Sequence, residues 1–212
     1  MFRRKPIAAF LCWFVLVYGL LLFPWPGVQK FYAGYFRVIG QGIFHHDAGL
    51  ESVNFEAAGQ EPGSGRFYTQ LTIANRNWLN HEGVGPMIKL KIDTRLVGWA
   101  PTALVVALIA ATPISWRRRG WALFWGLLCI HGFIFTALGL HIWYESAKLS
   151  LVTFSQFWAA VIYGVQYTLY EQMGARLVAA ALIWIAVTFR ASDLKTLLPE
   201  EEAGGDEVES EG

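Results

Sequence analysis

Four blocks of apolar residues divide the chain, at residues 7–25, 98–115, 121–143 and 173–189. An α-helix rises about 1.5 Å per residue, so about 20 apolar residues cross the hydrocarbon core of a bilayer, which is about 30 Å thick. The four blocks come close to that length, and more polar segments separate them. The pattern predicts an α-helical polytopic membrane protein with about four transmembrane helices.

The first apolar block belongs to residues 1–27, which begin with the basic run Arg3-Arg4-Lys5. A basic start before an apolar run is typical of a secretory signal. The block ends in Phe23-Pro24-Trp25-Pro26, however, and no small-x-small cleavage pattern follows it. We therefore predict an uncleaved signal anchor that forms the first transmembrane helix, with its amino terminus in the cytoplasm.

Residues 28–44 have the spacing of an amphipathic helix. Apolar and aromatic side chains recur three and four positions apart, which places them on one helix face: Val28, Phe31, Tyr32, Tyr35, Phe36, Ile39 and Ile43. Lys30, Arg37 and Gln41 lie off that face. Such a helix either lies in the outer membrane interface or packs on the domain that follows, and the pattern leaves both open.

Residues 45–97 change from helical spacing to alternation. Three runs at 50–58, 66–76 and 87–97 read as β-strands, because Gly, Pro and Asn clusters separate them. From Met87 to Ile92 apolar and polar residues alternate, which predicts one buried and one wet face. About fifty residues form only a small antiparallel β domain, which is marginally stable alone. We therefore expect it to pack against the membrane helices or a partner.

Residues 98–190 contain the second, third and fourth predicted transmembrane helices. Basic residues at the amino terminus, at 117–119, and at Arg190 and Lys195 all fall on one side of a four-span arrangement. Since positively charged loops favour the cytoplasm, both termini are expected there and the β domain is expected outside. The predicted location is the plasma (inner) membrane of a bacterium.

Two segments near the end of the chain are not predicted to cross the membrane. Residues at about 150–170 are apolar but carry Ser155, Gln156, Gln166 and Thr168, which favours a helix on the outer face. Residues 191–212 are acidic and predict a solvated, disordered cytoplasmic tail.

Composition agrees with a membrane protein. Of the 212 residues, 55% are hydrophobic, and the ten Trp and fifteen Phe suit helix ends that lie at membrane interfaces. The net charge of +1 excludes nucleic-acid binding through bulk charge. Cys12 and Cys129 both lie in apolar runs, which does not suggest a disulfide framework. The expected partners are the lipid bilayer and other membrane protein subunits.

Two groups of residues could carry thiol or metal chemistry. Cys129 and His131 resemble a thiol–base pair, but residues two apart on a helix point in different directions, and apolar surroundings oppose thiolate formation. Metal ligands could come from two turns: His45, His46, Asp47, His81 and Glu82. Adjacent histidines do not easily serve one site, so we predict no metal, no cofactor and no catalytic residue.

Ionisable groups near membrane depth are a better functional signal, because burying them without a partner is costly. Five such residues are expected to gather at the outer membrane surface: Asp93, Arg95, Glu145, Glu171 and Arg176. They either pair locally and snorkel towards water, or form a polar cluster for a partner or a substrate. The residues predicted to contact a partner are Asp93, Arg95, Glu145, Arg176, Tyr35 and Phe36.

The run "IDTRLVGWAPTALVVALIAATPISWRRR", residues 92–119, resembles the uncharacterised membrane proteins associated with bacterial exosortases. The similarity covers about the central third of the chain. The resemblance implies an accessory role in protein sorting or envelope assembly, and it supplies no catalytic residues. Exosortases themselves carry a Cys, Arg and His set at the outer face, which this chain does not match because Cys129 is predicted deep in its span.

These features favour a non-catalytic accessory or scaffold subunit of a membrane complex, which binds a partner through its outer β domain and transmembrane helices. The alternative is a membrane enzyme or transporter that uses the outer polar cluster of Asp93, Arg95, His141, Glu145 and Arg176. A subunit of an energy-converting complex is a third hypothesis, although the chain shows no cofactor ligands of its own.

Overall fold

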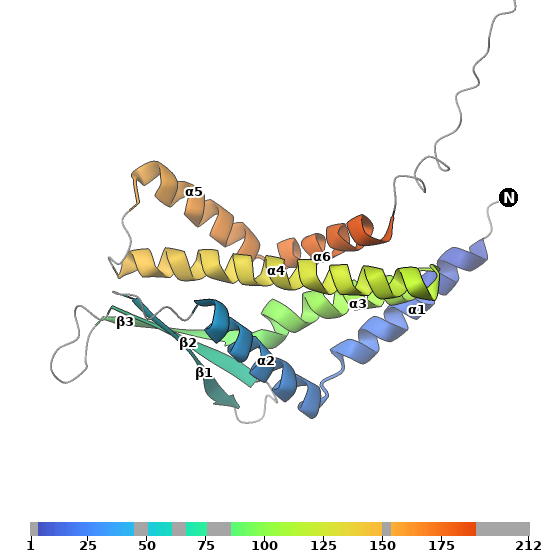
Figure 1. Ribbon diagram of the computed structural model, residues 1–212, viewed down its shortest axis with the longest axis horizontal. Coiled ribbons are helices and arrows are strands. Elements are labelled where there is room, and N and C mark those ends of the chain that lie inside the picture. Colours follow the sequence, from blue (N-terminus) through green and yellow to red (C-terminus); the bar gives the residue numbers. More distant parts are fainter. Residues whose placement is uncertain (1–3, 45–50, 61–66, 76–85, 150–153, 190–212) are drawn as a thin grey trace, which may run out of the picture.

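The computed structural model describes residues 4–44, 51–60, 67–75, 86–149 and 154–189 (Figure 1). They are mostly helical and include one small antiparallel sheet. The elements in chain order are α1 (Arg4–Leu22), α2 (Pro26–Phe44), β1 (Glu51–Gln60), β2 (Phe67–Asn75), β3 (Met87–Asp93), the π-helical turn η2 (Arg95–Trp99), α3 (Ala100–Ala111), α4 (Trp116–Lys148), α5 (Gln156–Gln166), the π-helical turn η3 (Tyr167–Glu171) and α6 (Met173–Thr188).

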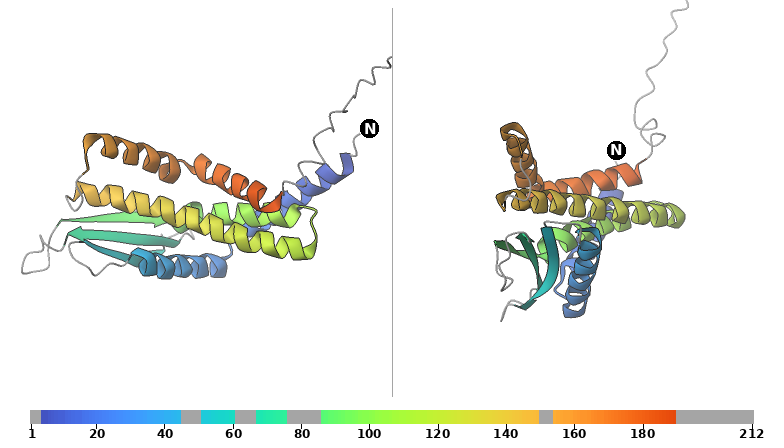
Figure 2. Two further views of the ribbon diagram at one scale, coloured as in Figure 1. Left: turned by 45° about the horizontal axis from the view of Figure 1, so that its top comes forward. Right: turned by 60° about the vertical axis from the view of Figure 1, so that its left-hand side comes forward.

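Helix α4 runs the length of the molecule and divides it into two ends (Figure 1). Its 33 residues extend about 50 Å, well beyond what a bilayer core requires. At one end α4 packs with α3 and α6. At the other end the sheet and α2 lie on one side of α4, and α5 lies on the opposite side (Figure 2). Helix α4 extends beyond both ends of the predicted span 121–143, and the basic residues 117–119 form its first turn.

Helix α3 lies at the centre of the helical end and packs against α1, α4 and α6. It is apolar around its whole circumference, as expected for a helix enclosed by others. Its buried residues include Ala103, Val105, Ala107 and Ile109. It lies close to α4 at Gly126, where an added Cβ would lie 2.9 Å from Ile109 Cδ1.

The sheet has the strand order β1-β2-β3 with antiparallel pairing throughout, which confirms the three predicted strands. One face carries a buried apolar set: Val53, Phe55, Leu71, Ile73 and Ile92. The other face carries polar residues in register, so that Glu56 pairs with Gln70 and Gln70 with Lys91. The alternation in the third run therefore predicted its two faces correctly.

The third strand ends earlier than predicted. The run 87–97 was expected to be extended, but β3 ends at Asp93 and Arg95 begins the turn η2. Asp93 explains the change, because its carboxylate accepts the backbone N–H groups of Arg95 at 3.0 Å and Leu96 at 3.3 Å. A carboxylate at this position satisfies orphan donors at a helix start.

Helix α2 packs on the sheet, as one of the two alternatives for residues 28–44 predicts. Phe36 is fully buried and stacks on Phe135 of α4. Gln41 accepts the backbone N–H of Phe55 in β1 at 2.9 Å. On the opposite side of α2, Phe31 is 78% exposed and Val38 is 71% exposed. The small β domain thus packs against α2 and α4.

Helix length and composition support only part of the prediction of four transmembrane helices. In the part of the chain that the structure describes, α4 alone is long and apolar enough to cross a bilayer by itself. Two bent pairs, α1 with α2 at 76° and α5 with α6 at 75°, raise the number to three if each pair is one span. The segment Arg95–Ala111 is a shorter apolar helix.

Candidate functional site

The charged triplet Asp93-Thr94-Arg95 lies between β3 and η2 and connects them to the end of α1. Arg95 Nη2 donates to the carbonyl of Leu22, the last residue of α1, at 2.6 Å. The Trp99 indole N–H donates to the carbonyl of Leu21 at 2.9 Å. The last carbonyls of a helix have no partner within the helix, so these two side chains cap α1.

Arg176 of α6 reaches the same place. Its side chain is 8% exposed, and Nη1 donates to the carbonyl of Leu96 in η2 at 3.2 Å. The cavity beside Arg95, which Gln29, Tyr32 and Trp99 also line, is about 10 Å³, the room of about one water. The arrangement therefore serves to hold α1, η2 and α6 together.

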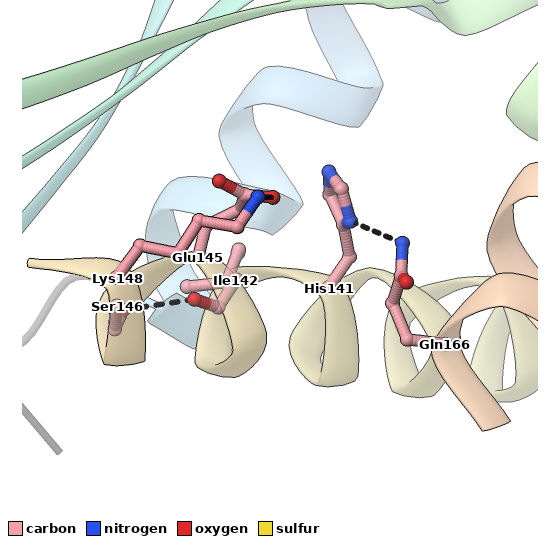
Figure 3. Close-up of polar contacts among 6 residues, drawn as sticks. All are labelled: His141, Ile142, Glu145, Ser146, Lys148 and Gln166. Carbon is pink, nitrogen blue, oxygen red and sulfur yellow. Dashed lines mark hydrogen bonds and ion pairs between the residues drawn. The ribbon is translucent and has the colours of Figure 1, made fainter. Parts of the chain in front are cut away.

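His141 and Glu145, predicted in the same cluster, lie further along α4 and face one side of it (Figure 3). Gln166 of α5 donates its side-chain N–H to His141 Nδ1 at 2.8 Å, and both side chains are buried. Glu145 is 6% exposed and binds Lys148 Nζ at 2.6 Å. These contacts attach α5 to α4 and neutralise a buried carboxylate.

The structure thus splits the predicted cluster into two contact groups. Asp93, Arg95 and Arg176 meet around η2, whereas His141 and Glu145 bind residues of α4 and α5. Gln166 was not predicted as the partner of His141. The sequence did contain a signal for a polar contact at Gln166, since it was one of the polar residues that made segment 150–170 unlike a membrane span.

The other candidates have structural positions of their own. His131 donates Nδ1–H to the carbonyl of Leu127 at 2.8 Å, and its ring meets Tyr35 edge-on with 5.5 Å between ring centroids. Cys129 is exposed. Among the described residues no three His, Cys, Asp or Glu side chains are grouped to hold a metal ion. The proposed ligands lie outside those residues: His45, His46, Asp47, His81 and Glu82.

Arginine side chains also cap two helices at the opposite end of the bundle. Arg119 Nη2 donates to the carbonyl of Thr112, which caps α3, at 3.0 Å. Arg118 Nη2 donates to the carbonyl of Thr188, the last residue of α6, at 2.6 Å. The basic run that predicted a cytoplasmic hairpin therefore also binds the helix ends beside it, where cations are favoured by the helix dipole.

A groove beside the edge strand β1 is a separate candidate site. It has a volume of about 600 Å³ and lies between α2 and β1, lined by Arg37, Val38, Gln41, Gly42, Asn54 and Phe55. Because Phe55 N–H bonds to Gln41 rather than to β2, the outer edge of β1 faces α2 and the groove. An edge strand flanked by a helix and a cation suits an extended polypeptide segment with a carboxylate.

No protein-family model matches the chain, and no characterised protein or solved structure matches it either. The geometry of the described residues is therefore the basis for a functional proposal.

Arg95 provides a test of the capping role. Replacing Arg95 by alanine should lower the free energy of unfolding by about 1–3 kcal/mol, because a charged hydrogen bond to the end of α1 is lost. The measurement is unfolding of the purified protein in mild detergent. Arg117→Ala removes an exposed arginine and is the control. Equal losses in the two variants would contradict the capping role.

Proposed function

We propose that this protein is a non-catalytic accessory subunit of a complex in the bacterial plasma membrane. The observation that carries the proposal is the use of the outer polar residues. Asp93 and Arg95 bind helix ends, Arg176 binds η2, and Glu145 binds Lys148, as an architectural role requires. A catalytic role would instead require these groups to converge on one reactive position.

The exposed apolar surface supports placement in a membrane. Three helices at the helical end expose large apolar side chains outwards, including Leu11, Leu16, Phe124, Leu128, Val178 and Leu182. A surface of this kind is costly in water and favourable in lipid. With residues 117–119 in the cytoplasm, the sheet end lies outside, as the basic residues predict.

The groove between α2 and β1 is the proposed partner contact. Arg37 offers a guanidinium there, and Val38 exposes 71% of its surface next to it. The partner would supply an extended segment with an acidic side chain. The resemblance of residues 92–119 to exosortase-associated proteins supports an accessory role in protein sorting or envelope assembly.

Gly42 allows the groove to be filled without disturbing the fold. An added Cβ at Gly42 meets no atom within 4 Å, and a leucine there also improves helix propensity. We expect Gly42→Leu to reduce the amount of co-purifying partner at least about tenfold, because the side chain occupies the groove. The measurement is purification from the native host in mild detergent, with quantification of stoichiometric proteins.

Gly27→Leu is the matched control, since Gly27 is an exposed glycine of α2 with equally open space and does not line the groove. It should retain the partner. A wild-type protein that purifies alone would overturn the accessory function. Equal recovery of partner by both variants would overturn the groove as its contact.

A further inference from the structure

A groove runs between α4 and α6 at the end of the bundle where α4 begins. Its volume is about 580 Å³, with Arg118 at one end, Trp121, Trp125 and Cys129 along α4, Val187 on α6 and Phe189 directly after α6. Arg118 is held there by its bond to the Thr188 carbonyl. A guanidinium has five N–H donors in a planar fork, a geometry that matches phosphate.

A second groove lies beside the first and shares Trp121 with it. It has a volume of about 390 Å³ and is lined by Arg117, Gly120, Trp121 and Phe124. Trp121 is 59% exposed and Phe124 is 56% exposed, so the wall between the two grooves projects outwards. Each groove thus combines an arginine with aromatic or aliphatic walls.

The length of the first groove fits one leaflet of a bilayer. Arg118 and Cys129 are eleven residues apart on one helix, which corresponds to about 16 Å along its axis. Half of a hydrocarbon core about 30 Å thick is about 15 Å. Arginine occurs at one end only, as required for a ligand with one charged end and an apolar body.

We propose that the paired grooves bind one anionic phospholipid of the cytoplasmic leaflet. Its phosphate would lie at Arg117 and Arg118, and its two acyl chains would lie on either side of Trp121. The inference rests on the proposed membrane placement, with the Arg117 end in the cytoplasm. Arginines between helices on that side attract anionic headgroups, and Trp favours the same depth.

The test uses the full-length protein in mild detergent, titrated with phosphatidylglycerol or phosphatidylcholine and examined by native mass spectrometry. We expect one phosphatidylglycerol to be retained at concentrations at least about tenfold lower than phosphatidylcholine requires. Arg117→Glu should abolish that preference without loss of fold, because Arg117 is exposed. Trp121→Ala should weaken retention of both lipids.

Lys30→Glu is the control, since it makes the same change of charge on α2, away from the grooves. Equal retention of the two lipids by the wild type would overturn the proposal, and so would an Arg117→Glu variant that behaves like the wild type. Glycerol 3-phosphate carries the charge without acyl chains, and full competition by it would overturn the role of the grooves. The partner is absent from this titration, so its outcome is independent of the co-purification result.

Discussion

Replacing Phe36 by alanine is expected to lower the free energy of unfolding by about 3–5 kcal/mol. Phe36 is 0% exposed and stacks on Phe135 of α4, with 5.5 Å between the ring centroids. The substitution removes a large buried ring and leaves a cavity where α2, the sheet and α4 meet. Because this contact holds α2 in place, the variant should also lose the groove beside β1.

Phe31→Ala is the matched control, since it makes the same substitution on the same helix at a side chain that is 78% exposed. It should change stability by no more than about 0.5 kcal/mol. The measurement is unfolding in mild detergent, monitored by tryptophan fluorescence. Similar losses for Phe31→Ala and Phe36→Ala would show that α2 is not anchored by its buried face.

Phe36 also shows what the amphipathic pattern of α2 could predict and what it could not. The spacing predicted one apolar face, and Tyr32, Phe36 and Ile39 do pack inwards. Phe31 belonged to the same predicted face and is exposed. The period of a helix predicts which residues share a side, but what covers that side depends on elements distant in the sequence. For this reason Phe36 was predicted as a partner contact, whereas it packs within the chain.

The strands were predictable because their pattern is local. Alternation from Met87 to Ile92 requires only that one face of a sheet be buried, and the structure pairs these residues with β2 in that sense. The end of β3 was not predictable in the same way. It depends on the Asp93 carboxylate accepting two backbone N–H groups, so a charged residue ends the strand and starts the helix.

The capping contacts could not be predicted from spacing at all. Arg95 and Leu22 are 73 positions apart, and Arg118 and Thr188 are 70 apart. Nothing in the sequence near an arginine indicates which helix end it will reach. Residue type is informative, however, because an arginine beside an apolar run needs acceptors, and the last carbonyls of a helix are acceptors without partners. The basic run thus contributes to packing, in addition to the membrane orientation that it predicts.

The helices of the helical end pack tightly around one glycine, Gly126, which the sequence pattern does not distinguish from the other glycines of α4. Gly126 is buried where α3, α4 and α6 meet, and an added Cβ would lie 2.9 Å from Ile109 Cδ1 and 3.1 Å from Val105 Cγ1. Val187 Cγ2 of α6 is 3.7 Å away. Gly132, further along the same helix, has no atom within 4 Å of such a Cβ. Small residues permit close packing only where another helix is present.

Gly126→Leu is therefore expected to lower the free energy of unfolding by about 3 kcal/mol, because α3 and α6 must move apart to admit the side chain. Gly132→Leu makes the same change six positions along the same helix, in open space, and should be neutral or slightly stabilising through helix propensity. Unfolding of both purified variants in mild detergent measures the difference. Equal stability of the two variants would mean that α3 and α6 do not pack closely against α4 at Gly126. The arginine caps alone would then hold the helical end together.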